Sequence, residues 1–220
     1  YGLKLKLIKR VKHVLGDIIA IEDNQGVLLT YFRNNILHLF IMPSLIASLV
    51  QHNGKIIRDD IHSVIQTLYP FLKAELFLKW DADKLPDVIN HVLEALISGE
   101  MILDDGQDTL YSPLPNSEAY SQLGVLATPV KQSLERYFMT LALLKQRRSG
   151  HATSKQIEDL SHLLGQRMSV LYEFNSPEFF DKALFQSFIG TLTEMGYIRK
   201  EENDVLYFDD GLIDMANNAR

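Results

Sequence analysis

The most apolar stretch of the chain reads Tyr31-Phe-Arg-Asn-Asn-Ile-Leu-His-Leu-Phe-Ile-Met-Pro-Ser-Leu-Ile-Ala-Ser-Leu-Val50. Its uninterrupted apolar parts are shorter than the roughly 18–20 residues that a helix needs to span a bilayer, and Pro43 should kink or end a helix. Such a stretch is typical of a core helix in a globular protein; the alternative is an interfacial helix that dips into a membrane. We therefore expect a fold built around a helix in this segment.

Polar residues gather at the start of that apolar stretch. Because polar groups at the head of an apolar helix need partners, these residues are candidates for an interface or a helper site. The alternative is that they cap and anchor the helix inside its own domain. The candidates are Tyr31, Arg33, Asn34, Asn35 and His38.

Further helices are predicted from capping residues and prolines downstream. Thr153 and Gln156 have the spacing of a capping box, and Thr128-Pro129 has the chemistry of a helix start. Lys73 and Glu75 are expected on a solvated helix face, with Glu75 spaced for a pair with Lys79. The predicted helices cover residues 59–68, with Pro70 interrupting or kinking before 71–80, then 83–98, 128–145, 154–165 and 176–195.

Short strand pairs are expected at three places. Residues 7–12 and 17–22 flank a turn at Gly16-Asp17, although a basic amphipathic helix over residues 3–15 is the alternative. A weak repeat at an offset of 96 residues gives the other two, each a helix, a strand, an acidic turn and a second strand, which is how a winged helix closes. The matching residues are Leu96, Ile102, Asp108, Leu110 and Tyr111 with Leu192, Ile198, Asp204, Leu206 and Tyr207.

The expected fold class is mainly α, with two or three short β-hairpins and winged-helix-like helical subdomains. Residues 112–122 are rich in Pro and Ser, which predicts a linker. The predicted organisation is a helical subdomain over 1–111, a linker over 112–127 and a second subdomain over 128–220. Because the chain starts at Tyr1 without Met, we expect it to be a fragment that begins inside a longer protein.

Charge is distributed unevenly along the chain. Residues 1–13 hold five cations and no acid, whereas the remainder has 17 basic and 28 acidic side chains. An acidic body disfavours nucleic-acid binding. The basic start is a candidate for lipid-headgroup contacts, and an exposed basic strand is the alternative. Its cations are Lys4, Lys6, Lys9, Arg10 and Lys12.

The chemistry needed for catalysis is missing from the sequence. A His held by a carboxylate is a common general base, but none of the seven histidines has an Asp five positions later. There is no cysteine, no phosphate-binding Gly-rich loop and no zinc motif, so we expect no catalytic residue, no metal and no cofactor in this chain.

Four blocks of the chain resemble the carboxy-terminal part of the bacterial glycerol-3-phosphate acyltransferases and of their dihydroxyacetone-phosphate relatives. The order and spacing of the blocks are kept over roughly residues 14–200. The blocks are residues 16–46 (with Leu29-Thr-Tyr-Phe-Arg-Asn-Asn-Ile-Leu-His38), residues 68–89 (with Leu72-Lys-Ala-Glu-Leu-Phe77), Leu134-Glu-Arg-Tyr137, and residues 166–198 (with Ser176-Pro-Glu-Phe-Phe-Asp-Lys-Ala183).

The resemblance implies a parent enzyme that acylates the sn-1 hydroxyl of glycerol 3-phosphate from acyl-CoA or acyl carrier protein, the first step of phospholipid synthesis. It also implies a peripheral protein on the cytoplasmic face of a bacterial inner membrane. The family's catalytic motifs lie upstream of the resembling region, so this chain is expected to be a non-catalytic domain that partners the catalytic domain of the same chain and, through its basic start, an anionic membrane surface. The alternative function is a stand-alone winged-helix adaptor or DNA-binding protein.

Overall fold

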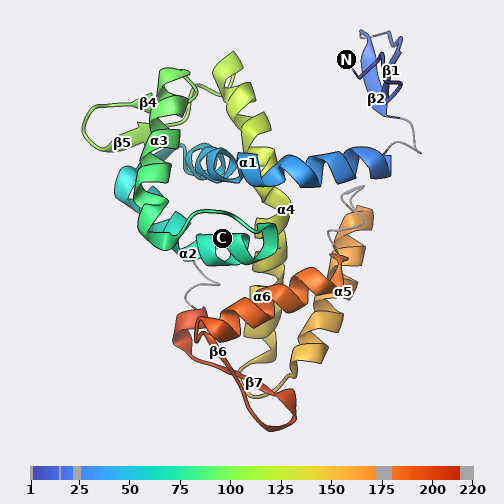
Figure 1. The fold of residues 1–220 in the computed structure, drawn as a ribbon, viewed down its shortest axis with the longest axis vertical. Helices are drawn as coiled ribbons and strands as arrows, with labels where there is room; N and C mark the ends of the chain where they lie inside the picture. The colour runs from blue at the N-terminus through green and yellow to red at the C-terminus, as the bar shows by residue number, and fades with distance from the viewer. Residues whose placement is uncertain (1, 15, 22–25, 172–179, 214–220) are drawn as a thin grey trace. The chain divides into compact units, whose positions relative to one another are not determined.

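A computed structural model describes residues 2–14, 16–21, 26–171 and 180–213. Within them the protein is mainly helical with short antiparallel strand pairs, which confirms the predicted fold class (Figure 1). The chain divides into two compact units, Tyr1–Leu39 and Phe40–Arg220. The elements in chain order are β1 (Ile8–Val11), β2 (Ile18–Ile21), α1 (Gly26–Asn53), β3 (Lys55–Ile57), α2 (Arg58–Leu76), the 3-10 turn η2 (Ala82–Lys84), α3 (Leu85–Ser98), β4 (Leu103–Asp104), β5 (Thr109–Tyr111), α4 (Glu118–Arg147), α5 (Ser154–Leu171), α6 (Lys182–Glu194), β6 (Ile198–Lys200), η4 (Glu202–Asp204) and β7 (Leu206–Phe208).

The first unit contains the predicted N-terminal hairpin. β1 and β2 pair antiparallel, with Ile8 opposite Ile21 and Val11 opposite Ile18. The hairpin prediction is therefore confirmed, and the alternative of a basic helix over residues 3–15 is wrong. The β-branched residues of β2 favour the extended backbone.

The second half of α1 is the central core helix of the larger unit. Ile41, Leu45, Ile46 and Val50 are fully buried, and so is the hydroxyl-bearing Ser44. A helix that is apolar all round belongs in a core, so the core interpretation holds for this half. The helix continues through Pro43 instead of ending there.

The same unit repeats its architecture with a period of 96 residues. α3 ends with Met101 N–H donating to Leu96 O, and α6 ends with Tyr197 N–H donating to Leu192 O, both at 2.9 Å. Each helix leads into a hairpin of the same register, Asp104 opposite Leu110 in β4–β5 and Lys200 opposite Leu206 in β6–β7. The predicted repeat is therefore confirmed.

The repeat extends upstream of these hairpins. β3 pairs with β5, and a single bridge between Thr153 and Val205 takes the corresponding place in the second copy. Gly54 and Gly150, which are 96 residues apart, both have positive φ directly before that pairing segment. Each copy thus consists of a helix, a strand or single bridge, two further helices and a hairpin, in that order. The similarity of these copies to winged helices stays a prediction.

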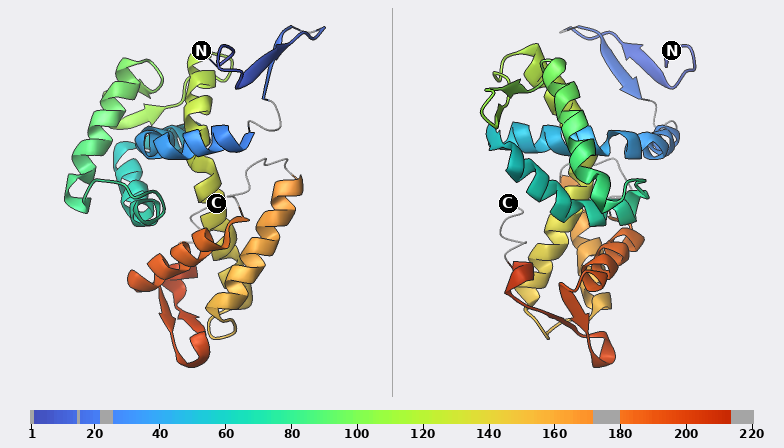
Figure 2. Two further views of the ribbon diagram at one scale, coloured as in Figure 1. Left: turned by 45° about the vertical axis from the view of Figure 1, so that its right-hand side comes forward. Right: turned by 60° about the vertical axis from the view of Figure 1, so that its left-hand side comes forward.

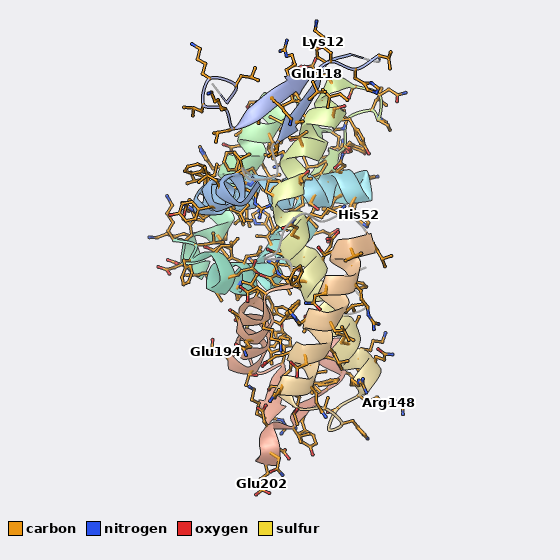
Figure 3. The ribbon with its side chains drawn as sticks, turned by 90° about the vertical axis from the view of Figure 1, so that its right-hand side faces the viewer. Lys12, His52, Glu118, Arg148, Glu194 and Glu202 are labelled. Atoms are coloured by element: carbon orange, nitrogen blue, oxygen red, sulfur yellow. The ribbon has the colours of Figure 1, made fainter. Side chains whose placement is uncertain are left out.

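Helix α4 begins earlier than the sequence predicts. Its N-cap is Ser117, whose hydroxyl accepts the Tyr120 N–H at 3.1 Å, and the helix runs through Pro129. Figure 3 labels Glu118 and Arg148 at its two ends, and Figure 2 shows it passing beside α1 and α5. Residues 118–127 are thus helix and not linker, and Thr128-Pro129 is not a helix start. The division into subdomains at 111 and 128 stays a prediction.

A side chain from the core helix bonds to the backbone of α4 on both sides of Pro129. Proline lacks the N–H that would close its own turn. The Ser44 hydroxyl accepts the Val130 N–H at 3.0 Å and donates to Ala127 O at 3.1 Å. This contact explains why a buried hydroxyl sits in an apolar helix and why α4 crosses α1 at this point.

Three other helix predictions have mixed outcomes. The capping box is confirmed, since Thr153 N–H donates to Gln156 Oε1 at 2.9 Å and Gln156 N–H donates to Thr153 Oγ1 at 3.3 Å. Pro70 was expected to interrupt or kink α2; it does not interrupt the helix, which continues to Leu76. The predicted start of the last helix at residues 176–178 lies outside the described residues; α6 begins at Lys182 with Asp181 as N-cap.

Candidate functional site

A buried ion pair joins α2 to α4 inside the larger unit. The side chains of Glu75 and Arg136 are 7% and 6% exposed, and Arg136 Nη2 donates to Glu75 Oε1. The Ser133 hydroxyl donates to the same oxygen at 2.7 Å, and the Tyr137 hydroxyl donates to Glu75 Oε2 at 2.7 Å. Both oxygens of the carboxylate therefore accept hydrogen bonds, which is what a charge needs in order to be buried.

An aromatic cluster covers one side of this ion pair. The Tyr137 ring stacks on Phe188 of α6 with centroids 4.4 Å apart and planes 6° apart, and Phe71 of α2 lies 5.0 Å from Phe188. Burial raises the pKa of the Tyr137 hydroxyl, and the neighbouring Glu75 carboxylate raises it further. The phenol thus stays protonated and acts as a hydrogen-bond donor.

This polar centre has the properties of a structural joint and not of a reaction centre. Both charged side chains bond to another member of the centre, although Arg136 Nε is buried without a hydrogen-bond partner among the described residues, and the pair is shielded from solvent. In the part of the chain that the structure describes, no group of three His, Asp or Glu side chains is placed to hold a metal ion. The centre therefore stabilises the packing of α2 on α4.

The sequence-based assignment of Glu75 to a solvated face is wrong. α2 ends at Leu76, and Phe77 takes the left-handed conformation (φ 53°), so Lys79 is not one helical turn away from Glu75. Lys73 instead donates to Trp80 O at 2.8 Å and pairs with Asp81 at 2.9 Å. The periodicity of α2 gave no sign that its acid would meet an arginine 61 positions later.

The candidate interface residues lie on the first half of α1. Tyr31, Arg33, Asn35 and His38 are all exposed, whereas the side chain of Asn34 lies outside the described part. α1 begins at Gly26, so these residues do not cap it. The structure places them along one exposed helical segment, and their role stays a prediction.

The basic candidates lie on the turn before β1 and on β1 itself. The side chains of Lys4, Lys6, Lys9, Arg10 and Lys12 are all exposed. Arg10 pairs with Asp17 across the hairpin at 3.6 Å, and both side chains of that pair are about half exposed. These cations thus have the solvent access that a headgroup contact requires.

Within the described residues, one helical segment, Asn35–Asn53, is long and apolar enough to cross a membrane by length and composition. Its central part, however, supplies the fully buried side chains of the core, among them Ile41, Leu45 and Ile46. The buried part of this segment therefore belongs to the protein interior, whereas Ile36, Leu39 and Phe40 at its start are exposed.

Comparison with known proteins gives one family. The family described as "Glycerol-3-phosphate acyltransferase C-terminal region" matches residues 1–201. A glycerol-3-phosphate acyltransferase of Pseudomonas aeruginosa (strain LESB58) is 39% identical over 219 residues, covering 100% of this chain and 26% of that protein. Proteins of the same name from Ectopseudomonas mendocina (strain ymp) and Pseudomonas fluorescens (strain SBW25) are 36% and 37% identical, with 98% and 99% of this chain covered. The chain spans 26–27% of the length of these relatives.

Proposed function

Since the chain belongs to the glycerol-3-phosphate acyltransferase C-terminal region family, we propose that it is the non-catalytic C-terminal part of an enzyme that acylates the sn-1 hydroxyl of glycerol 3-phosphate. The acyl donor is acyl-CoA or acyl carrier protein, and the product enters phospholipid synthesis. The match over residues 1–201 carries this proposal, together with the absence of a His-x-x-x-x-Asp motif from the 220 residues.

The inner geometry of the larger unit supports a scaffolding role. Its most deeply buried charges, Glu75 and Arg136, neutralise each other. A general base must reach the proton that it abstracts, and the Glu75 carboxylate is closed off by Tyr137 and Ser133. In this proposal the groups that perform the transfer lie in the part of the relatives that precedes the matched region.

We further propose that the parent enzyme is peripheral on the cytoplasmic face of a bacterial inner membrane. The exposed cations at residues 4–12 support this placement, because each Lys or Arg near an anionic surface contributes about 1 kcal/mol. Sedimentation with anionic vesicles tests the proposal. Replacing Lys4, Lys6 and Lys12 with Gln should reduce co-sedimentation with the vesicles. Equal co-sedimentation of both forms would show that these cations do not contribute to membrane binding.

The exposed polar residues of α1 are proposed as an interface or helper site of the intact enzyme. Arg33→Ala should lower acyl transfer by the intact enzyme, and Arg167→Ala, at an exposed arginine of α5, is the matched control. Unchanged activity and stability after Arg33→Ala would leave Arg33 with no role in the enzyme.

The adaptor or DNA-binding alternative is not favoured. Beyond residue 13 the chain has 17 basic and 28 acidic side chains, which repel a phosphate backbone. α3 and α6, which precede the hairpins, are not basic helices.

The experiment that tests the main proposal compares acyl transfer by three proteins: the intact enzyme, the same enzyme without this region, and this chain alone. The intact enzyme should transfer acyl groups to glycerol 3-phosphate, and the chain alone should not. Transfer by the chain alone would contradict a non-catalytic role, and a folded but inactive intact protein would contradict the proposed reaction.

A further inference from the structure

The described side chains of the first unit form no core of their own. None of the side chains described in residues 2–39 is buried, whereas the buried apolar residues of the protein begin at Ile41. An isolated two-stranded hairpin is marginally stable at best, and a segment of this length needs a partner surface to stay folded. The folded state of residues 1–39 therefore depends on contacts with something else.

Strand β2 has the sequence of a strand that is covered on both faces. Its four residues, Ile18-Ile-Ala-Ile21, are all apolar, and the three isoleucines are 48–61% exposed. A hairpin with one wet face alternates apolar and polar residues, whereas an uninterrupted apolar run is typical of a strand inside a sheet with both faces packed. β2 pairs only with β1 among the described strands, so its other edge is open.

Strand β1 has a sequence typical of an edge strand of a β-sheet. Lys9 and Arg10 lie in its middle, opposite Ala20 and Ile19 of β2. Lysines and arginines on an edge strand protect it from further pairing. The hairpin is thus asymmetric, since β1 suits the outside of a sheet and β2 suits its interior.

The first half of α1 adds a second uncovered apolar surface to the same unit. Leu28, Phe32, Ile36 and Leu39 are spaced by four, four and three residues, which places them on one face of the helix. All four are exposed, Leu28 the least at 42% and Leu39 the most at 61%. This stripe is wide enough for a helix to pack on another apolar surface.

We propose that residues 1–39 complete the fold of the region that precedes this chain in the full-length acyltransferase. The open edge of β2 pairs with a strand of a β-sheet in that region, β1 becomes the edge of the enlarged sheet, and the α1 stripe packs on the same region. The occupant is part of the same polypeptide, because the family is a C-terminal region and the relatives extend about three quarters of their length beyond the match.

A membrane is a poorer partner for this hairpin. An open strand edge cannot enter the hydrocarbon layer without leaving its backbone N–H and C=O groups unpaired. Pairing with a protein strand satisfies those groups and covers the isoleucines together. The inference depends on the chain being the C-terminal part of a longer protein and does not depend on acyl transfer.

Amide hydrogen exchange followed by mass spectrometry tests this pairing. The full-length protein and this 220-residue chain are compared without lipid, and the full-length protein is also measured with phosphatidylglycerol-containing vesicles. Peptides that cover residues 18–21 should exchange on the order of 100-fold more slowly in the full-length protein without lipid. A peptide over β5, whose Leu110 is fully buried, should exchange equally in both proteins and is the internal control.

Two results of the exchange experiment would overturn the proposal. Equally fast exchange of residues 18–21 in both proteins would show that β2 has no further strand partner. Slow exchange that needs the vesicles would show that lipid covers the hairpin. Neither result depends on enzyme activity, so the proposed acyltransferase function would survive both.

A pair of lysine substitutions provides an independent test. Ile19→Lys places a charge on the face that the proposal buries, and it should restore fast exchange over residues 18–21 in the full-length protein. Leu103→Lys is the matched control, because Leu103 is also a strand residue and is 50% exposed in β4 of the larger unit. Equal protection of residues 18–21 in both variants would contradict the burial of Ile19.

Discussion

Replacing Glu75 with alanine removes the acceptor at the centre of the buried polar site. The Arg136 guanidinium, on a side chain that is only 6% exposed, loses its counter-ion. The hydroxyls of Ser133 and Tyr137 lose their acceptor as well. Breaking a buried pair by removing one partner costs about 3–5 kcal/mol, because the remaining charge stays desolvated. A domain of this size loses about 2–4 °C in Tm per kcal/mol, so Glu75→Ala should lower Tm by roughly 6–20 °C.

Urea unfolding of the chain measures this loss, with the single tryptophan, Trp80, as the fluorescence probe. The triple variant Glu75→Leu/Arg136→Met/Tyr137→Phe should recover most of the stability, since apolar residues of similar volume often replace a buried ion pair without loss. Asp159→Ala, which removes a half-exposed pair with Lys182, should have little effect. A free energy of unfolding that falls by less than about 1 kcal/mol in Glu75→Ala would refute the buried-pair reasoning.

Three further predictions concern pH, the α4 bend and the repeat. Folding raises the pKa of Tyr137, so its contribution to the free energy of unfolding is complete below the unfolded pKa of about 10 and is lost as the pH rises further. In urea titrations at alkaline pH, Tyr137→Phe should therefore reduce the fall of the free energy of unfolding with pH. Ser44→Ala should cost about 1–3 kcal/mol by leaving the backbone groups beside Pro129 unpaired, and the cost should shrink in a Pro129→Ala background, as chemical denaturation of the four variants would show. Gly150→Ala should lower Tm more than Gly54→Ala: both positions have positive φ, but only at Gly150 would the new Cβ meet a side chain, at 2.9 Å from Tyr207; equal losses would contradict that steric difference.

The elements that the sequence predicts correctly are those decided by local chemistry. The Thr153–Gln156 capping box and the strand pair around Gly16 each depend on residues within a few positions of one another. The helix start predicted at Thr128-Pro129 is wrong, because proline is most often found in the first turn of a helix and here lies inside one. On both sides of Pro129 the backbone bonds to Ser44, which lies 85 positions before the proline and has no local signature.

For the candidate sites too, the features that depend on residues far apart in the sequence are the ones that were missed. Tyr31 and the basic start are exposed in the structure, and the interface and lipid-headgroup roles proposed for them stay predictions. The burial of Glu75 is missed, because it depends on Arg136 in another helix and on the unexpected end of α2 at Leu76. The pairing surface proposed for β2 has a local signal in the sequence. The four residues of β2 are all apolar, which is typical of a strand that is packed on both faces.

The position of the buried ion pair relative to the repeat indicates its structural role. α2 belongs to the first copy and α4 to the second, and the residues 96 positions away from Glu75 and Arg136 are Leu171 and Phe40, both exposed and apolar. The pair is therefore not part of the repeated unit but lies between the two copies, where α2 also packs on α6. Two of the blocks that carry the family resemblance, residues 68–89 and 134–137, meet across this joint. The residues of those blocks thus hold one copy against the other.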